Sequence, residues 1–443
     1  MSKVLYIIFI SLFSLTIISC GSSSDGGSST TSTTSDDDDT TNDGTTNDGT
    51  ITLSSSLAYI DVTDAESLLI VPGSSSSRSV SRSSFASSTT NTLFKITETG
   101  AVEEVEYKDA DNNTYTVTSQ PVSIDKVDSN YIVLIFDSDE LNPTSCYLTN
   151  KSTGAVYDLG SSDNKCPVTQ GYMKRKKIFS DNNSNLYYRY RPSSTTYLRQ
   201  VNYSDPTAIT ASMYTPDSEG VNHFIVDSSG NAVYTIWESP MKTRIRKSNG
   251  GYYNLSSGDS GLTYWIGLDG NIYHKTTSTV YKTIIDSNYN VTVSTYTTST
   301  ASMSNEYTKI LKLQQIIAFA TYGSNSYITI DNGTAFNTVN VPLSIISRAK
   351  ASSNYVYLSG TDNSSSNSVL VKINPSDNSS SQMYTKGTYD IYNFNVTSDD
   401  NITFSALRMN DGKKVLGKIL ANGTLSITDE SINKEITILE RIR

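Results

Sequence analysis

The chain has 443 residues, a formal net charge of −10 and charged side chains at only 18% of its positions. This acidic balance disfavours a nucleic-acid-binding protein, because tracking a phosphate backbone needs clustered basic residues. Thirty tyrosines against eleven phenylalanines and two tryptophans suit half-exposed strands, in which a ring packs while its hydroxyl group stays in water.

The amino terminus has the three parts of a secretion signal. Lys3 gives a positive start, residues 4–18 are almost wholly apolar, and the segment ends Ile17-Ile18-Ser19-Cys20. The apolar run is shorter than the roughly 20 residues that span a bilayer. Its ending resembles the lipobox of bacterial lipoproteins, in which the signal is removed before a cysteine that carries lipid. The resemblance implies that residues 1–19 are the signal peptide and that acyl chains on Cys20, such as palmitate, hold the protein on a membrane.

Gly21 follows this cysteine, at the position where an aspartate in such lipoproteins directs retention in the inner membrane. The resemblance therefore implies a lipid-anchored envelope protein, with the outer membrane favoured, at its periplasmic face or on the cell surface. The alternative is an ordinary signal peptide in which Cys20 is incidental.

Residues 20–55 are expected to form a disordered linker. They are rich in Ser, Thr, Asp and Gly, include four successive aspartates at 36–39, and contain little that could be buried. The aspartates suit a solvated spacer better than a calcium loop, because the ligand spacing of such a loop is missing. The Ser-rich residues 74–90 are likewise expected to be a disordered loop.

Residues 56–443 read as a β-rich domain. Short apolar or alternating runs, such as residues 131–136 and 355–358, are bounded by Asn, Asp, Gly and Ser, which is the pattern of strands and turns. A turn of Asp, Ser and Asn followed by a strand with tyrosine recurs at 181–188, 227–234 and 269–273. The spacing of these anchors, about 30 to 55 residues, fits a four-stranded propeller blade.

The rhythm of these hairpins is similar to that of PQQ-like and other bacterial β-propellers. The resemblance implies an all-β propeller of about seven or eight blades. Residues 57–71 are expected to form a lone early strand that pairs near residues 436–439 and closes the ring. Tandem β-sandwiches are the structural alternative, because the same strand spacing permits them.

Cys146 and Cys166 remain once Cys20 is assigned to lipid. An exported chain leaves the reducing cytosol, so we expect the two to form a disulfide that closes a loop across one hairpin. Two buried free thiols are the alternative.

Few residues suggest chemistry. His223 and His274 are the only histidines, and both occupy strand positions, where a structural role is expected. Residues 258–261, Gly-Asp-Ser-Gly, resemble the nucleophile loop of trypsin-like serine proteases, but Leu262 replaces the next glycine, so we interpret them as a turn. No cofactor, metal site or catalytic residue is expected.

Carboxylates and one basic run complete the candidates. Carboxylates are the only plausible catalytic groups, and Asp227, Glu238 and Asp269 are candidates for glycoside hydrolysis, which needs a pair of them. Nothing distinguishes them from turn residues, because aspartate is also common in turns. The basic run at 174–177 is expected to be a solvated loop, with contact to anionic lipid or lipopolysaccharide as the alternative.

The sequence therefore predicts an envelope lipoprotein whose propeller is a non-catalytic binding or scaffolding module. Its expected partners are the membrane, through lipid on Cys20, and envelope proteins or glycans, but not nucleic acid. The alternative is a carbohydrate-active enzyme, either a carboxylate glycoside hydrolase or a lyase, on the same scaffold.

Overall fold

The computed structural model describes residues 47–50, 57–70, 93–117, 121–136, 145–160, 166–168, 178–191, 195–215, 220–236, 242–255, 263–275, 279–298, 305–310, 315–322, 325–331, 336–430, 436 and 438–442. The chain divides into two units, residues 1–43 and 44–443, and every described residue belongs to the second. The predicted signal peptide, Cys20 and the loop at 74–90 lie outside the described residues.

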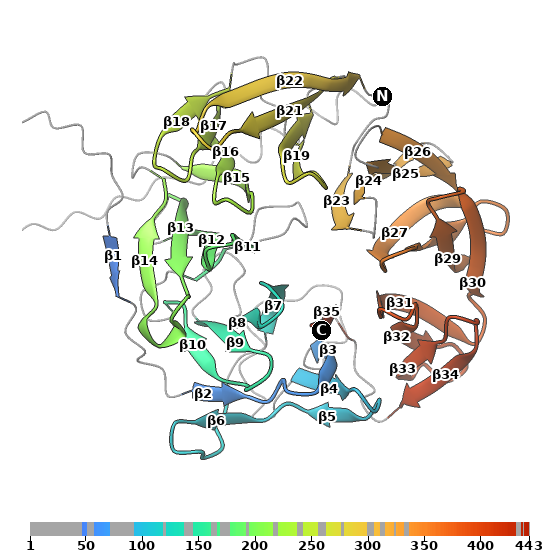
Figure 1. The fold of residues 1–443 in the computed structure, drawn as a ribbon. Helices are drawn as coiled ribbons and strands as arrows, with labels where there is room; N and C mark the ends of the chain where they lie inside the picture. Colours follow the sequence, from blue (N-terminus) through green and yellow to red (C-terminus); the bar gives the residue numbers. More distant parts are fainter. Residues whose placement is uncertain are drawn as a thin grey trace, which may run out of the picture. The chain divides into compact units, whose positions relative to one another are not determined.

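The described residues form eight antiparallel sheets of four or five strands, which we number as blades 1 to 8 (Figure 1). Blade 1 contains β3 (Ala65–Ile70), β4 (Leu93–Thr97), β5 (Val102–Glu104) and β35 (Ile438–Arg441), and blade 2 contains β7 (Pro121–Lys126), β8 (Tyr131–Phe136), β9 (Ser145–Asn150) and β10 (Val156–Asp158). Blade 3 contains β11 (Ile178–Ser180), β12 (Asn185–Tyr190), β13 (Tyr197–Asn202), β14 (Thr210–Met213) and β1 (Asn47–Thr50). Blade 4 contains β15 (Val221–Val226), β16 (Ala232–Ile236), β17 (Lys242–Arg246) and β18 (Tyr252–Asn254).

The remaining blades follow in chain order. Blade 5 contains β19 (Thr263–Ile266), β20 (Ile272–Lys275), β21 (Thr279–Ile285) and β22 (Val291–Thr298), and blade 6 contains β23 (Asn305–Ile310), β24 (Gln315–Tyr322), β25 (Asn325–Asp331) and β26 (Phe336–Val341). Blade 7 contains β27 (Leu343–Ala351), β28 (Val356–Asp362), β29 (Ser368–Asn374) and β30 (Ser379–Thr385). Blade 8 contains β31 (Tyr389–Val396), β32 (Ile402–Arg408), β33 (Lys414–Ile419) and β34 (Leu425–Asp429). A two-stranded sheet joins β2 (Leu57–Ile60) to β6 (Tyr107–Asp109), and η2 (Pro206–Ala208) is a single 3₁₀ turn.

Apolar side chains pack between neighbouring blades, which is how a propeller buries the faces of its small sheets. Between blades 7 and 8, for example, Tyr357 and Leu370 pack with Phe394 and Phe404. Blades 2 and 3, 3 and 4, and 8 and 1 share comparable clusters. Between blades 5 and 6, the Tyr296 hydroxyl donates to Asp331 Oδ1 at 3.3 Å. The all-β propeller predicted from the sequence is confirmed.

The last strand of this unit pairs with an early strand in blade 1. Strand β35 pairs with β3, and the register places Leu439 opposite Leu69 and Ile438 opposite Ile70. The predicted closure of the ring is therefore confirmed. The expectation of one lone early strand is wrong, because a turn at residues 61–64 separates β2 from β3 and β2 pairs with β6.

The range expected to be a linker, residues 20–55, also contains one strand. Strand β1 pairs with β14 at the edge of blade 3, where Thr50 lies opposite Thr210. An edge strand has unpaired N–H and C=O groups that another strand can use. Backbone pairing of this kind needs no apolar side chains, so the polar composition of residues 47–50 did not indicate it.

The recurring Asp and Asn turns have one geometry. In the turn before β16, Asp227 Oδ1 accepts the backbone N–H groups of Ser229 and Asn231, and its Oδ2 accepts the Asn231 side-chain amide. The same Asp-to-Asn pattern is present at Asp109–Asn113, Asp181–Asn185 and Asp286–Asn290. The repeat seen in the sequence is therefore a hairpin device, in which the side chain satisfies the turn's backbone donors.

Candidate binding site

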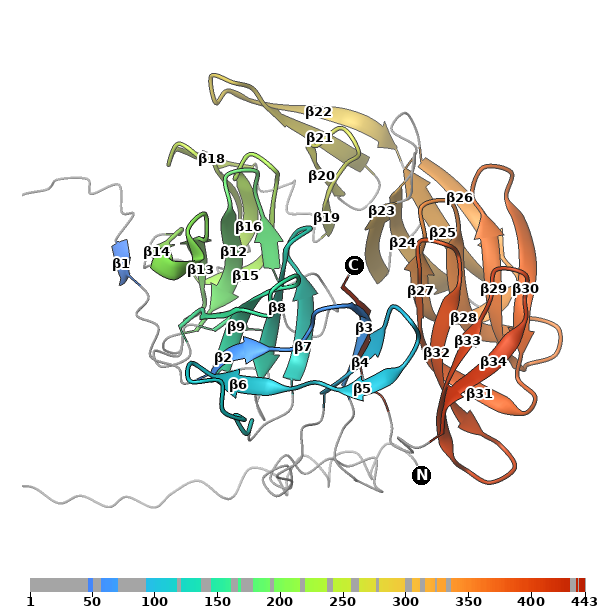
Figure 2. The same ribbon diagram turned by 60° about the horizontal axis from the view of Figure 1, so that its bottom comes forward.

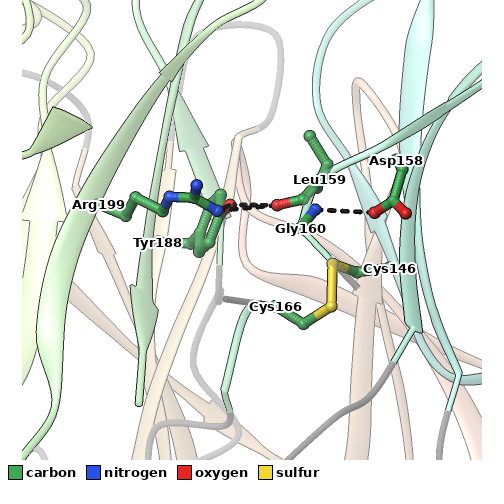
Figure 3. Close-up of a disulfide and its surroundings, with 7 residues drawn as sticks. All are labelled: Cys146, Asp158, Leu159, Gly160, Cys166, Tyr188 and Arg199. Atoms are coloured by element: carbon green, nitrogen blue, oxygen red, sulfur yellow. Dashed lines mark hydrogen bonds between the residues drawn. A yellow bond between two sulfur atoms is a disulfide. The ribbon is translucent and has the colours of Figure 1, made fainter. Parts of the chain in front are cut away.

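The predicted disulfide between Cys146 and Cys166 is present, with a Cα–Cα distance of 5.6 Å. Cys146 belongs to β9, and Cys166 lies beyond β10, so the bond spans the β9–β10 hairpin and part of the segment that follows. Nearby, the Leu159 carbonyl accepts hydrogen bonds from Arg199 Nη1 at 2.8 Å and from the Tyr188 hydroxyl at 3.2 Å (Figure 3). Both sulfurs belong to buried residues, and the bond links β9 of blade 2 to the segment that connects blade 2 with blade 3.

Both histidines lie in the interior. His223 is buried in blade 4, and His274 is fully buried in blade 5 with its ring stacked on Tyr281 at a centroid distance of 5.1 Å. No group of three or more His, Cys, Asp or Glu side chains within the described ranges is placed to hold a metal ion. Burial of both side chains in the core fits the structural role expected for these two histidines.

Of the candidate carboxylates, the structure describes Asp227, in the β15–β16 turn of blade 4, and Asp269, in the β19–β20 turn of blade 5. Asp227 is buried and occupied by its own turn, and burial raises its pKa. Burial also opposes ionisation of Asp269, but hydrogen bonds from Lys282, Asn271 and Tyr273 outweigh it and lower the pKa of Asp269 to about 2. Glu238, the turn at 258–261 and the basic run at 174–177 lie outside the described residues.

A polar hollow of about 370 Å³ lies between blades 7 and 8. Figures 1 and 2 show blades 7 and 8 as neighbours, and in Figure 1 β27 lies next to β31. The wall of the hollow consists of two groups of residues, one from blade 7 and one from β31. These residues are Ser347, Arg348, Ser359, Gly360, Thr361, Ser368, Val369, Leu370 and Tyr384, and Asp390, Ile391 and Tyr392.

Both facing strands are interrupted at this hollow by a β-bulge. On β27, Ile346 pairs with Gly360 and Arg348 with Ser359, which leaves Ser347 as the extra residue. On β31 the extra residue is Tyr392, between Ile391 and Asn393. A bulge leaves one residue outside the ladder and redirects neighbouring side chains, and bulges are frequent beside functional sites.

Gly360 is required for this local geometry. A Cβ atom at this position would lie 1.9 Å from the Ile345 carbonyl oxygen, on the strand that carries the bulge. The glycine therefore lets β27 approach β28 closely where the ladder is irregular.

The wall carries hydroxyl groups that remain available. The hydroxyls of Ser347, Ser359 and Ser368 form no hydrogen bond with any residue of the described ranges. Tyr384 is different, because its hydroxyl donates to the Tyr389 carbonyl at 2.9 Å and accepts the Tyr389 N–H. The hollow thus presents donors and acceptors on a pre-formed frame, as small-molecule sites do.

Sequence reasoning missed this site. Ser, Arg and Tyr at strand positions 347, 348 and 392 look like ordinary half-exposed strand residues. A bulge has no dependable sequence signal. Arg348 and Tyr392, which lie on the two bulged strands, are 44 positions apart and meet only in the folded chain. The isolated Gly360 within the strand pattern was the one usable signal, because such a glycine indicates a bulge or a close approach.

These observations define the protein as an all-β propeller with a polar hollow between two blades. No protein-family model and no curated protein matches its sequence. Among solved structures it is similar to a mutant puromycin hydrolase, with 10% identity over 80% of this chain and 58% of that chain and a TM-score of 0.42.

Two further solved structures are similar. One is an oligogalacturonate lyase from Vibrio parahaemolyticus, with 8% identity over 70% of this chain and 85% of that chain and a TM-score of 0.37. The other is a puromycin-hydrolyzing peptidase from Mycobacterium tuberculosis, with 9% identity over 69% and 53% and a TM-score of 0.42. The chain spans little more than half the length of the two puromycin-hydrolysing proteins. At such identities and TM-scores these likenesses carry no argument about activity, and the fold assignment rests on the strand pairing.

Proposed function

We propose that this protein is a lipid-anchored propeller of the bacterial envelope that binds a glycan in the hollow between blades 7 and 8, without turning it over. The observation that carries the proposal is the set of unpaired serine hydroxyls beside Arg348 in this hollow. Sugars present closely spaced hydroxyl groups, and a wall of short hydroxyl side chains can pair with them as both donor and acceptor.

The anchor belongs to the same proposal. The lipobox-like ending at Cys20 supports attachment by lipid, and several acyl chains would make attachment stable because each buried CH₂ group contributes about 0.8 kcal/mol. No helix in the described part of the chain is long and apolar enough to cross a membrane. An anchored binding module suits an envelope protein that holds glycans or glycan-bearing partners near the membrane.

We favour binding over hydrolysis as the function because of the small number of carboxylates in the described wall of the hollow. Asp390 is the one carboxylate among the described residues of the wall, and Lys386 Nζ lies 2.6 Å from its Oδ2. A retaining or inverting glycosidase needs two carboxyl groups facing one bond. The hollow therefore offers more for holding a sugar than for cleaving it.

The test uses the full-length protein in detergent micelles on a glycan array, followed by chromatographic analysis of any captured glycan. Ser359→Trp fills the hollow, and Ser381→Trp places the same side chain on the exposed part of β30 as a control. We expect capture by wild type and by Ser381→Trp, loss of capture with Ser359→Trp, and no cleaved product. Equal capture by both tryptophan variants would remove the hollow from the proposal, and cleaved product would favour the enzyme.

A further inference from the structure

Arg348 is the cation in the wall of the hollow, and it is held in place from one side. Its Nε donates to the carbonyl oxygen of Tyr392 at 2.8 Å. That carbonyl belongs to the bulged residue of β31, so the bulge on one blade orients the guanidinium of the other. The terminal nitrogens of Arg348 donate to no residue within the described ranges.

The charges around Arg348 are already matched elsewhere. Asp390 is paired with Lys386 at 2.6 Å, and Glu440 with Lys350 at 3.4 Å. Within the described part of the chain, no carboxylate lies within ion-pair distance of Arg348. Burial lowers the pKa of Arg348, while the nearby charge of Glu440 raises it, and an arginine remains protonated at neutral pH. The hollow therefore contains one half-buried positive charge without a direct counter-ion.

Such a charge is unfavourable unless something balances it. A guanidinium fixed through Nε presents its remaining N–H groups in one plane, and this arrangement matches a carboxylate with two parallel hydrogen bonds. Ser347 and Ser359 lie in the same wall, so a ligand that carries a carboxylate next to hydroxyl groups would satisfy both the guanidinium and the serines. Uronic acids have this combination on one ring.

We infer that the hollow selects acidic glycans, with the carboxylate of a uronic acid residue on Arg348 and ring hydroxyls on the serines. This inference rests on the proposed glycan-binding function and narrows it to one ligand class. An acidic peptide carries the carboxylate but lacks the ring hydroxyls, so it would leave the serines unsatisfied.

The test measures affinity of the full-length protein in micelles by calorimetry. The probes are tetrasaccharides of hyaluronan, galacturonan and alginate, the carboxyl-reduced neutral form of each, and a hexaglutamate peptide. The variants are Arg348→Gln and Arg348→Lys. Lys413→Gln is the matched control, because it removes one positive charge from an exposed position of blade 8, outside the wall of the hollow. Thermal unfolding of each variant shows that the fold is retained.

We expect at least one uronate to bind more tightly than its reduced form. Arg348→Gln should weaken uronate binding about 10- to 100-fold, the effect of losing a charge-assisted hydrogen bond, and should leave binding of the reduced form within about twofold. Arg348→Lys should recover part of the loss, because it keeps the charge but not the planar pair. Lys413→Gln should change affinity about twofold or less.

Three results would overturn the inference alone: equal binding of uronates and their reduced forms, no effect of Arg348→Gln, or equal binding of the hexaglutamate peptide. In the first two cases a neutral glycan can still occupy the hollow, and the sensitivity to Ser359→Trp would show it. Failure of every saccharide to bind, acidic or reduced, would instead overturn the proposed function itself.

Discussion

Lys151 Nζ donates a hydrogen bond of 2.8 Å to the carbonyl oxygen of Ile442, although the two residues are 291 positions apart. The same ammonium group donates to the Asp128 carbonyl at 3.2 Å, and the side chain is buried. Lys151 follows β9 in blade 2, whereas Ile442 follows β35 in blade 1. The end of the closing strand β35 is therefore tied to blade 2 as well as to blade 1, in which the ring closes.

We predict that Lys151→Met lowers the free energy of unfolding by about 1–3 kcal/mol, because the buried Ile442 carbonyl and the partly buried Asp128 carbonyl lose a charged donor. Urea denaturation followed by tryptophan fluorescence measures this loss. Lys413→Met is the control at an exposed position, where a change within about 0.5 kcal/mol is expected. Equal effects of the two substitutions would show that the Lys151 bonds do not stabilise the closure.

The disulfide should contribute about 3 kcal/mol to stability, because it closes a loop of 20 residues in the unfolded chain. The double variant Cys146→Ser, Cys166→Ser should lose this amount in urea denaturation. Reduction of the wild-type protein should reproduce the loss, whereas the double variant should not respond to the reductant. Two free thiols in the denatured, unreduced protein, found by thiol titration, would contradict the bond.

The lowered pKa of Asp269 predicts that the stability of the folded protein decreases at acidic pH. Its pKa is lowered to about 2 in the folded protein, against about 3.9 in an unfolded chain. The folded state therefore binds fewer protons, so the stabilisation is complete above pH about 4 and is lost as the pH falls towards about 2. Asp269→Asn should flatten the decline in melting temperature across this window, and the exposed Asp111→Asn should leave the slope unchanged. An unchanged slope for Asp269→Asn would count against the ion pair with Lys282, whose Nζ lies 2.6 Å from Oδ2.

The close approach of β27 to Gly360 predicts that a larger residue at this position would disturb the candidate site. Gly360→Ala places a methyl group against the Ile345 carbonyl oxygen, and overpacking of this kind costs about 1–3 kcal/mol. Gly387→Ala is the matched control, because the nearest atom to its Cβ would be the Thr385 carbonyl oxygen at 3.8 Å. We expect Gly360→Ala to reduce both the melting temperature and glycan capture. Full glycan capture by that variant would show that the bulge does not shape the hollow.

The proposed anchor predicts that Cys20→Ala releases the protein from membranes. Without the cysteine no lipid can be attached, and the remaining polar sequence that follows offers no substitute. Fractionation of cells that express the variant measures this, with the double serine variant of Cys146 and Cys166 as the control that should stay with the membrane. Unchanged membrane association of Cys20→Ala would refute the lipid anchor.

Much of the architecture was predictable from local sequence. Residues 131–136 are aliphatic or aromatic, most of them β-branched or aromatic, and they form strand β8, which is paired on both sides. The Asp227–Asn231 pattern indicated a turn because the aspartate satisfies backbone donors within five residues. The two cysteines and the apolar residues at both ends of the domain also indicated the disulfide and the closing pair.

The sequence by itself thus determined the strands, the turns, the disulfide and the ring closure, because these depend on alternation, local hydrogen bonding and a shared need to bury apolar residues. Only the tertiary structure decided that Ser347 and Tyr392 are bulged and that Arg348 Nε meets the Tyr392 carbonyl at 2.8 Å. A bulge depends on register against a partner strand, and the hollow depends on how two complete blades pack. Neither relation is contained in the residues of one strand.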